Sequence, residues 1–124
     1  MRIRDKVKKP QRPVVAYEIL PPREKDGTLN SYAEIISSLL SQTHIDAINI
    51  REVHDESGRG DRPVTNQKRG EPREFGRLLQ DIVGVEAIVN RVVVHEPYDT
   101  QMKWIEETNK EYEIENMIIV GGES

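Results

Sequence analysis

Four short apolar runs rich in strand-forming residues alternate with three stretches of helical periodicity. The runs cover residues 14–20, 45–53, 85–94 and 117–120. Regular alternation of strand and helix is typical of a parallel sheet with right-handed crossovers. The sequence therefore predicts an α/β fold, and we find no repeat between its units.

Local signals mark where the helices begin and end. They are Ser31 with Glu34 as a capping box, Pro72 as a first-turn residue, Gly84 as a C-terminal cap, and Asp99 or Thr100 as an N-cap. Residues 1–13 carry five Lys or Arg before Pro10, and we expect a mobile, solvated basic arm there. The domain proper is then expected over residues 14–124, with a charged loop over residues 54–71 that is either functional or simply solvated.

Composition excludes several classes of protein. Without cysteine, the chain has neither a disulfide framework nor a thiolate metal site, and its three histidines have no metal-binding spacing, so we expect no metal. No apolar run is long enough for a membrane span, and no apolar segment follows the basic start as in a secretory signal. A net charge of −4 argues against nucleic acid as the main partner. We expect a cytoplasmic protein.

Polar residues occur late in each apolar run, where a buried strand should be apolar. They are Glu18 in the first run, Asn49, Arg51 and Glu52 in the second, Asn90 and Arg91 in the third, and Gly121, Gly122 and Glu123 after the fourth. Because side chains alternate across a strand, Arg51 shares a face with Asn49, and only one of Asn90 and Arg91 points inward. The pattern predicts a polar pocket at one end of the sheet, where parallel α/β folds bind ligands.

Two interpretations of these residues are open. Glu18 is either a general acid in such a pocket or one half of a structural ion pair with Arg51 that fills a barrel mouth. Gly121 and Gly122 either let a phosphate or flavin approach closely or form a simple turn. In the loop, Arg59, Arg62, Lys68 and Arg69 are candidates for phosphate contacts, and a solvated loop is the alternative.

The segment Tyr-Glu-Ile-Leu-Pro-Pro-Arg at residues 17–23 resembles the opening strand of the methylenetetrahydrofolate reductase family, which reads aromatic-Glu-x-x-Pro-Pro-(Arg/Lys). Residues 48–62 resemble the family's second strand and its Ser-Gly-x-x-Asp-Arg-like loop. Residues 85–87 resemble the start of its third strand, and residues 117–123 resemble its fourth, which commonly ends in Gly-Asp. The resemblance spans residues 14 to 124.

This resemblance implies a TIM-type (βα)8 barrel that holds FAD at the carboxyl ends of its strands. Such an enzyme passes a hydride from NAD(P)H through the flavin to methylenetetrahydrofolate, in the one-carbon metabolism that serves methionine biosynthesis. Glu18 then matches the acid that protonates the folate, Glu123 the acidic residue near the flavin and pterin, and Asn90 the position of a flavin-contacting histidine. Arg51, Gly121 and Gly122 are expected to line the same cofactor pocket.

The sequence also departs from the family pattern. Residues 51–53 read Arg-Glu-Val where the family has Thr-Tyr-Gly, residues 90–92 read Asn-Arg-Val in place of His-x-Thr, and Glu123 replaces Asp. These changes support an alternative: a non-catalytic folate- or protein-binding module on the same scaffold, without flavin.

The chain provides about four strands of the eight that a barrel needs, which makes it a half barrel inactive on its own. Four parallel strands would leave two unpaired edges, which favour association. The open explanations are a fragment, part of a split enzyme, two copies that pair into a pseudo-barrel, or a different packing. We expect a homo-oligomer or a second chain that completes the barrel.

Overall fold

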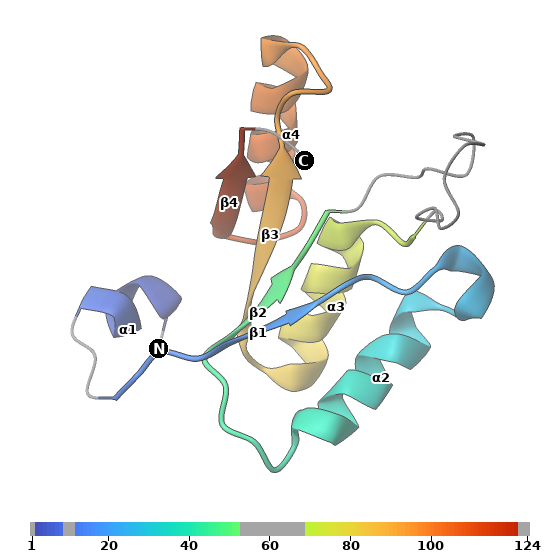
Figure 1. The fold of residues 1–124 in the computed structure, drawn as a ribbon, viewed down its shortest axis with the longest axis vertical. Coiled ribbons are helices and arrows are strands. Elements are labelled where there is room, and N and C mark those ends of the chain that lie inside the picture. Colours follow the sequence, from blue (N-terminus) through green and yellow to red (C-terminus); the bar gives the residue numbers. More distant parts are fainter. Residues whose placement is uncertain (1, 9–11, 53–68, 122–124) are drawn as a thin grey trace.

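The computed structural model describes residues 2–8, 12–52 and 69–121 (Figure 1). Its elements, in chain order, are α1 Ile3–Lys8, β1 Ala16–Ile19, the 3-10 helix η1 Glu24–Asp26, α2 Leu29–Leu40, β2 Ala47–Ile50, α3 Pro72–Val83, β3 Glu86–Val92, α4 Tyr98–Lys110 and β4 Asn116–Val120. Within these residues, no helix is both long and apolar enough to cross a membrane.

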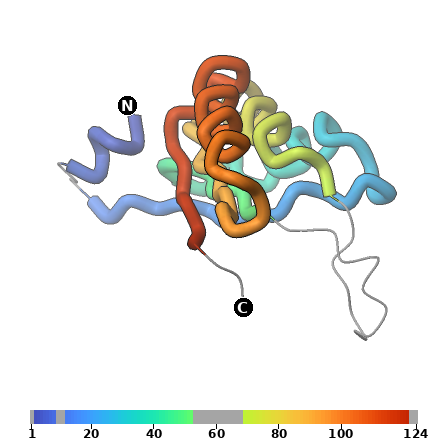
Figure 2. The backbone as a smooth tube through the Cα atoms, turned by 90° about the horizontal axis from the view of Figure 1, so that it is seen from above, coloured from blue at the N-terminus to red at the C-terminus, as the bar shows by residue number. Residues whose placement is uncertain are grey.

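The four strands form one parallel sheet in the order β1-β2-β3-β4. Helices α2, α3 and α4 all lie on the same side of this sheet (Figure 2). The predicted alternation of strand and helix and the parallel α/β fold are therefore confirmed. This arrangement is compatible with four consecutive units of a (βα)8 barrel.

The core lies between the sheet and helix α3. Ile48 and Ile50 of β2 align with Ala87 and Val89 of β3, and all four side chains are buried. Phe75 and Leu79 of α3 complete the same apolar cluster. The helices pack on this face of the sheet because the apolar side chains of β2 and β3 gather there.

Helix α3 approaches the sheet closely at Gly76. A Cβ atom there would lie 3.0 Å from Ile114, 3.1 Å from Ile50 and 3.3 Å from Ala87, closer than nearly all ordinary contacts. A side chain at this position would therefore press on these three core residues, which would have to shift by a few tenths of an ångström.

The predicted boundaries of α3 are confirmed. Pro72 occupies the first turn, and Gly84 ends the helix with a left-handed backbone at φ 83°. The predicted start of α2 is wrong: the cap is Thr28, whose hydroxyl accepts a hydrogen bond from the backbone N–H of Ser31 at 3.1 Å. An N-cap side chain accepts a hydrogen bond from a backbone N–H two or three residues later in the chain. Ser31 supplies that N–H, so it lies in the first turn of the helix and is not the N-cap itself.

The predicted cap of α4 is also wrong. The helix begins one residue before Asp99, after Pro97, whose side chain makes no capping hydrogen bond. The arm predicted over residues 1–13 contains a helix that the sequence analysis did not predict. This helix is α1. Its Ile3 side chain is buried, and the Ile3 backbone N–H donates to the Glu86 carboxylate at 3.2 Å. Helix α1 therefore lies at the amino-terminal end of β3.

Candidate functional site at the carboxyl ends of the strands

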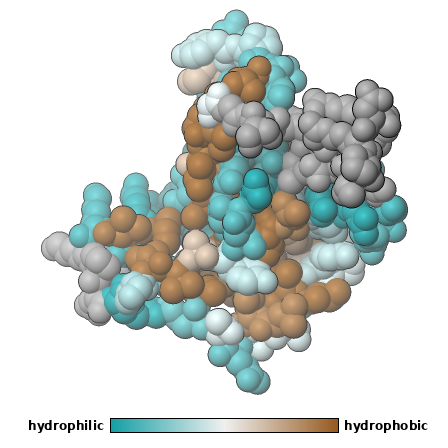
Figure 3. All heavy atoms as spheres, viewed as in Figure 1, coloured by the Kyte–Doolittle hydropathy of each residue, from teal (hydrophilic) through white to brown (hydrophobic). Residues whose placement is uncertain are grey.

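The side of the sheet opposite α2, α3 and α4 carries the predicted polar residues. We call it the open face and define it by residues whose side chains alternate with the buried core positions: Ala16, Glu18, Asn49, Arg51, Ile88, Asn90, Asn116 and Ile118. In Figure 1, β1, β2 and β3 pass in front of α3 and α4, so this face is turned towards the viewer. Figure 3 shows both hydrophobic and hydrophilic atoms on it.

Glu18 and Arg51 form an ion pair on the open face. The Arg51 Nε atom lies 3.2 Å from the Glu18 Oε1 atom, and Glu18 stands beside Asn49 in the register of β1 and β2. The two side chains are 58% and 56% exposed, in the order Arg51 and Glu18. The expected pairing is present, but four strands alone do not enclose the polar pocket expected around Glu18.

Asn49 and Asn90 present buried side-chain oxygens to this face. Within the part of the chain that the structure describes, neither Oδ1 atom accepts a hydrogen bond. Buried polar atoms in folded proteins almost always have a partner, and leaving one unpaired costs about 1–3 kcal/mol. These two amides therefore keep an unused hydrogen-bond acceptor, which a ligand could reach only after the side chains move.

The structure decides which residue of the Asn90–Arg91 pair faces inward. Arg91 points to the helix side, where its Nε atom donates to Gln101 Oε1 at 2.7 Å and its guanidinium lies 4.8 Å from the centre of the Trp104 ring. Its Nη1 atom lies 3.6 Å from Glu52. Asn90, the neighbour in sequence, is consequently on the open face.

The residues expected after β4 are described only in part. Gly121 directly follows the strand, and a Cβ atom there would meet nothing within 4 Å. The space around Gly121 is open, which agrees with both a turn and a ligand approach. Gly122 and Glu123 lie outside the described residues, as do Arg59, Arg62 and Lys68 of the loop.

Arg69 has a partner within the protein, where the sequence suggested a loop that contacts phosphate. Its Nη1 atom donates to the carbonyl of Pro21 at 2.8 Å, and the Gly70 N–H donates to the carbonyl of Pro22 at 2.9 Å. These bonds tie the segment before α3 to the end of β1. Beside them is a pocket of about 370 Å³, lined by Pro21, Glu24, Glu52, Arg69, Gly70, Glu71 and Pro72.

Sequence reasoning missed this pocket because both segments that form it looked like independent loops. Three carboxylates and Arg69 are among its lining residues; Glu52 also pairs with Arg91 and Glu71 with Arg73, and the buried Arg69 Nε atom has no acceptor within the described residues. The lining residues follow β1 and β2 or precede and begin α3, so the pocket lies beyond the carboxyl ends of these two strands, and none of its lining residues belongs to the open face.

Across residues 2–8, 12–52 and 69–121, no three His, Cys, Asp or Glu side chains come together in a way that could hold a metal ion. The candidate site is therefore an arrangement of one carboxylate, one guanidinium and two amides.

Comparisons with known proteins give no assignment: no protein-family model matches the chain, and no curated protein matches it significantly.

Proposed function

We propose that this chain is one half of a cytoplasmic (βα)8-barrel flavoenzyme of the methylenetetrahydrofolate reductase type, with its site at the carboxyl ends of β1 to β4. The observation that carries the proposal is the gathering of Glu18, Arg51 and Asn90 from three neighbouring strands on the open face. Parallel α/β proteins bind their ligands at this end of the sheet. The resemblance of residues 17–23 to the family's opening strand gives the reaction class.

The residues present suit a flavin. The amide oxygens of Asn49 and Asn90 are buried and have no partner among the described residues, so a small movement of either side chain would expose an acceptor for the N–H group of a flavin ring. Arg51 would offer a guanidinium to an anionic oxygen. Gly121 leaves open space beside the strand end. When bound, FAD takes a hydride from NAD(P)H and passes it to the folate.

Glu18 is assigned the role of general acid. It stands on β1, on the same face as the two amides, and Arg51 contacts it at 3.2 Å. Arg51 orients the carboxyl group, and Glu18 donates a proton to the folate nitrogen whose release opens the five-membered ring. Exclusion of water by a ligand and by the rest of the barrel would strengthen both interactions.

An FAD titration of the purified chain tests the cofactor assignment. We expect saturable binding in the micromolar range, read from the change in flavin fluorescence. Asn90→Leu should weaken binding by about tenfold, since one lost hydrogen bond of about 1.4 kcal/mol is a factor of ten. Asn109→Leu is the matched control, because Asn109 is exposed on α4, remote from the open face. Equal weakening by both variants, or no binding by the native chain, would contradict the proposal.

The closed ion pair favours a second candidate. Glu18 and Arg51 already satisfy each other, as in a structural pair at a barrel mouth. A folate- or protein-binding module without flavin would keep this pair and need no proton donor. Colour distinguishes the two candidates, because a flavoprotein purified from cells is yellow and the binding module is colourless.

A further inference from the structure

Both outer strands of the sheet have one side without a strand partner. Within the described residues, β1 pairs only with β2, and β4 pairs only with β3. Natural proteins protect such edges with Lys, Pro or bulges. The stretches Ala16–Ile19 and Asn116–Val120 contain neither Lys nor Pro. Their free backbone N–H and C=O groups are therefore available to another strand.

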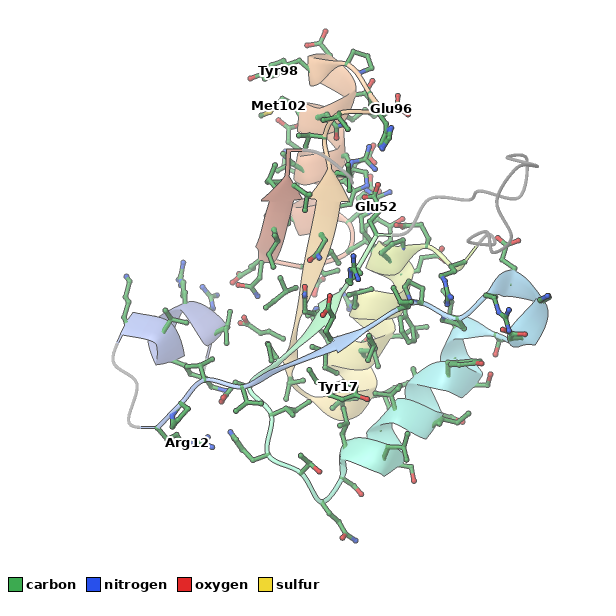
Figure 4. The ribbon with its side chains drawn as sticks, in the orientation of Figure 1. Arg12, Tyr17, Glu52, Glu96, Tyr98 and Met102 are labelled. Carbon is green, nitrogen blue, oxygen red and sulfur yellow. The ribbon has the colours of Figure 1, made fainter. Side chains whose placement is uncertain are left out.

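Exposed apolar side chains accompany both edges. Tyr17 is 42% exposed on β1, and Ile35 and Leu39 are 53% and 68% exposed on α2, the helix that follows β1. Ile119 is 51% exposed on β4, and Met102 is 39% exposed on α4, the helix that precedes it. Figure 4 shows Met102 near the top of the view on α4 and Tyr17 well below it on β1. We call these two groups the β1 border and the β4 border.

The two borders are built in the same way, from an edge strand and the helix beside it. Each has one exposed apolar residue on the helix side of an edge strand, Tyr17 or Ile119, and further apolar residues on a flanking helix. All four strands run in the same direction, so the β4 border of one copy can meet the β1 border of another with the strands parallel. Such a head-to-tail contact gives a closed ring when the rotation returns to the start.

We propose that a second copy of this chain occupies both borders. β4 of each copy pairs with β1 of the other, which gives an eight-stranded ring with two-fold symmetry and no free edge. The apolar chemistry of the two borders matches, and neither edge strand carries a charge on its helix side that would oppose the contact. A second copy brings a β1 border and a β4 border together, so one kind of chain is sufficient to close the ring.

The dimer also completes the candidate site, and this consequence rests on the proposed function. Glu18 lies on β1 and is 56% exposed in a single copy. In the ring, β4 of the partner copy pairs with β1 and covers the free edge beside Glu18. The carboxyl ends of the partner's strands then lie at the same end of the ring as those of the first copy. Two equivalent Glu18–Arg51 pairs then face one interior.

Sedimentation velocity over a range of concentrations tests the dimer. We expect the native chain to sediment as a dimer at micromolar concentrations, and Ile119→Lys and Leu39→Lys each to sediment as monomers. Every contact joins one β1 border to one β4 border, so a charge at either border weakens both contacts. Val7→Lys is the matched control, since Val7 is 60% exposed on α1, outside both borders, and should remain dimeric.

Cross-linking tests the orientation. The native chain has no cysteine, so single cysteines can be introduced without background. A mixture of Tyr17→Cys and Ile119→Cys chains should yield a covalent dimer with a short bismaleimide, and each variant alone should not. A monomeric native chain, a species that keeps growing with concentration, dissociation of Val7→Lys, or cross-linking of either variant alone would overturn the proposal.

The FAD titration separates this proposal from the proposed function. A dimer of the expected geometry that binds no flavin would support the ring and contradict the flavoenzyme. A monomer that binds flavin would support the flavoenzyme and contradict the ring.

Discussion

The carboxylate of Asp46 accepts a hydrogen bond from the backbone N–H of Val15 at 2.8 Å. Asp46 directly precedes β2 and Val15 directly precedes β1, so this bond fixes the starts of two neighbouring strands. The other carboxylate oxygen lies 3.1 Å from Lys6 of α1, 3.1 Å from His44 and 3.7 Å from Arg12. One buried side chain therefore joins the amino-terminal helix, β1 and β2.

Asp46→Ala is expected to destabilise the protein. The substitution leaves the Val15 N–H without its acceptor and Lys6 without its counter-ion, and removing one partner of a buried pair is among the costlier single changes. The urea midpoint should fall several-fold further than for Asp81→Ala. Asp81 is the control because its ion pair with Arg77 lies on the surface of α3, with the Asp81 side chain 58% exposed. Equal effects of the two substitutions would show that the Asp46 contacts do not hold the fold together.

The same carboxylate gives stability a defined pH dependence. The hydrogen bond from Val15, assisted by Lys6 and His44 and opposed by burial, holds the pKa of Asp46 well below its usual range. A group with a lowered pKa contributes its full stability above its unfolded pKa of about 3.9, and this stability is lost as the pH falls towards the folded pKa. Urea midpoints measured from neutral pH to pH 2 should therefore fall more steeply below about pH 4 for the native chain than for Asp46→Asn.

Arg73 connects α3 to α4. Its guanidinium lies 4.9 Å from the centre of the Trp104 ring and 4.7 Å from that of Tyr112, and its side chain is only 12% exposed. Arg73→Leu should lower the free energy of unfolding by about 2 kcal/mol, because it removes the ring contacts and the cation that pairs with Glu71 and Glu107. Trp104 is the single tryptophan, so its fluorescence reports unfolding directly. Arg4→Leu, at an exposed position of α1, should have little effect, and a comparable loss would contradict this role for Arg73.

Gly76→Val tests the close approach of α3 to the sheet. The added side chain would press on Ile50, Ala87 and Ile114, and overpacking of this kind costs about 1–3 kcal/mol. Gly121→Val provides the comparison, because nothing lies within 4 Å of its Cβ position, and its effect should stay within about 0.5 kcal/mol. Thermal or urea unfolding of the two variants distinguishes a crowded site from a general intolerance of valine.

Glu18→Gln tests the general acid in the assembled enzyme. The amide keeps the size of the side chain and loses the acidic proton, so folate reduction should cease while reduction of the flavin by NAD(P)H continues. Separate measurement of the two half-reactions by flavin absorbance gives the answer, and equal loss of both would contradict the assignment. Stability should change by less than about 1 kcal/mol, since the Glu18–Arg51 pair is largely solvated.

Several local features could be predicted from sequence because their cause is local. Proline fixes its own backbone angle and lacks an N–H, so Pro72 indicated a helix start, and glycine tolerates a positive φ, so Gly84 indicated a helix end. The capping hydroxyl of α2 was misplaced by three residues, because Thr28 and Ser31 are chemically equivalent caps and the backbone decides between them. The strands were predicted to be longer than they are, because apolar residues beside a strand can be buried without pairing in the sheet. Ile45, for example, is buried but lies before β2.

The candidate site was predictable as a set of residues and not as an arrangement. Hydrophobic periodicity and the positions of Glu18, Arg51 and Asn90 determined the order of elements and the end of the sheet at which polar groups gather, since both follow from side-chain alternation along the chain. Only the tertiary structure decided that Asn90 rather than Arg91 faces the open side, that Arg69 is bonded to Pro21, and that Asp46 anchors Val15. Each of these three contacts joins residues from separate segments. Such residues meet only after the strands have paired in register and the helices have covered one face of the sheet, so neither segment's sequence alone predicts the contact.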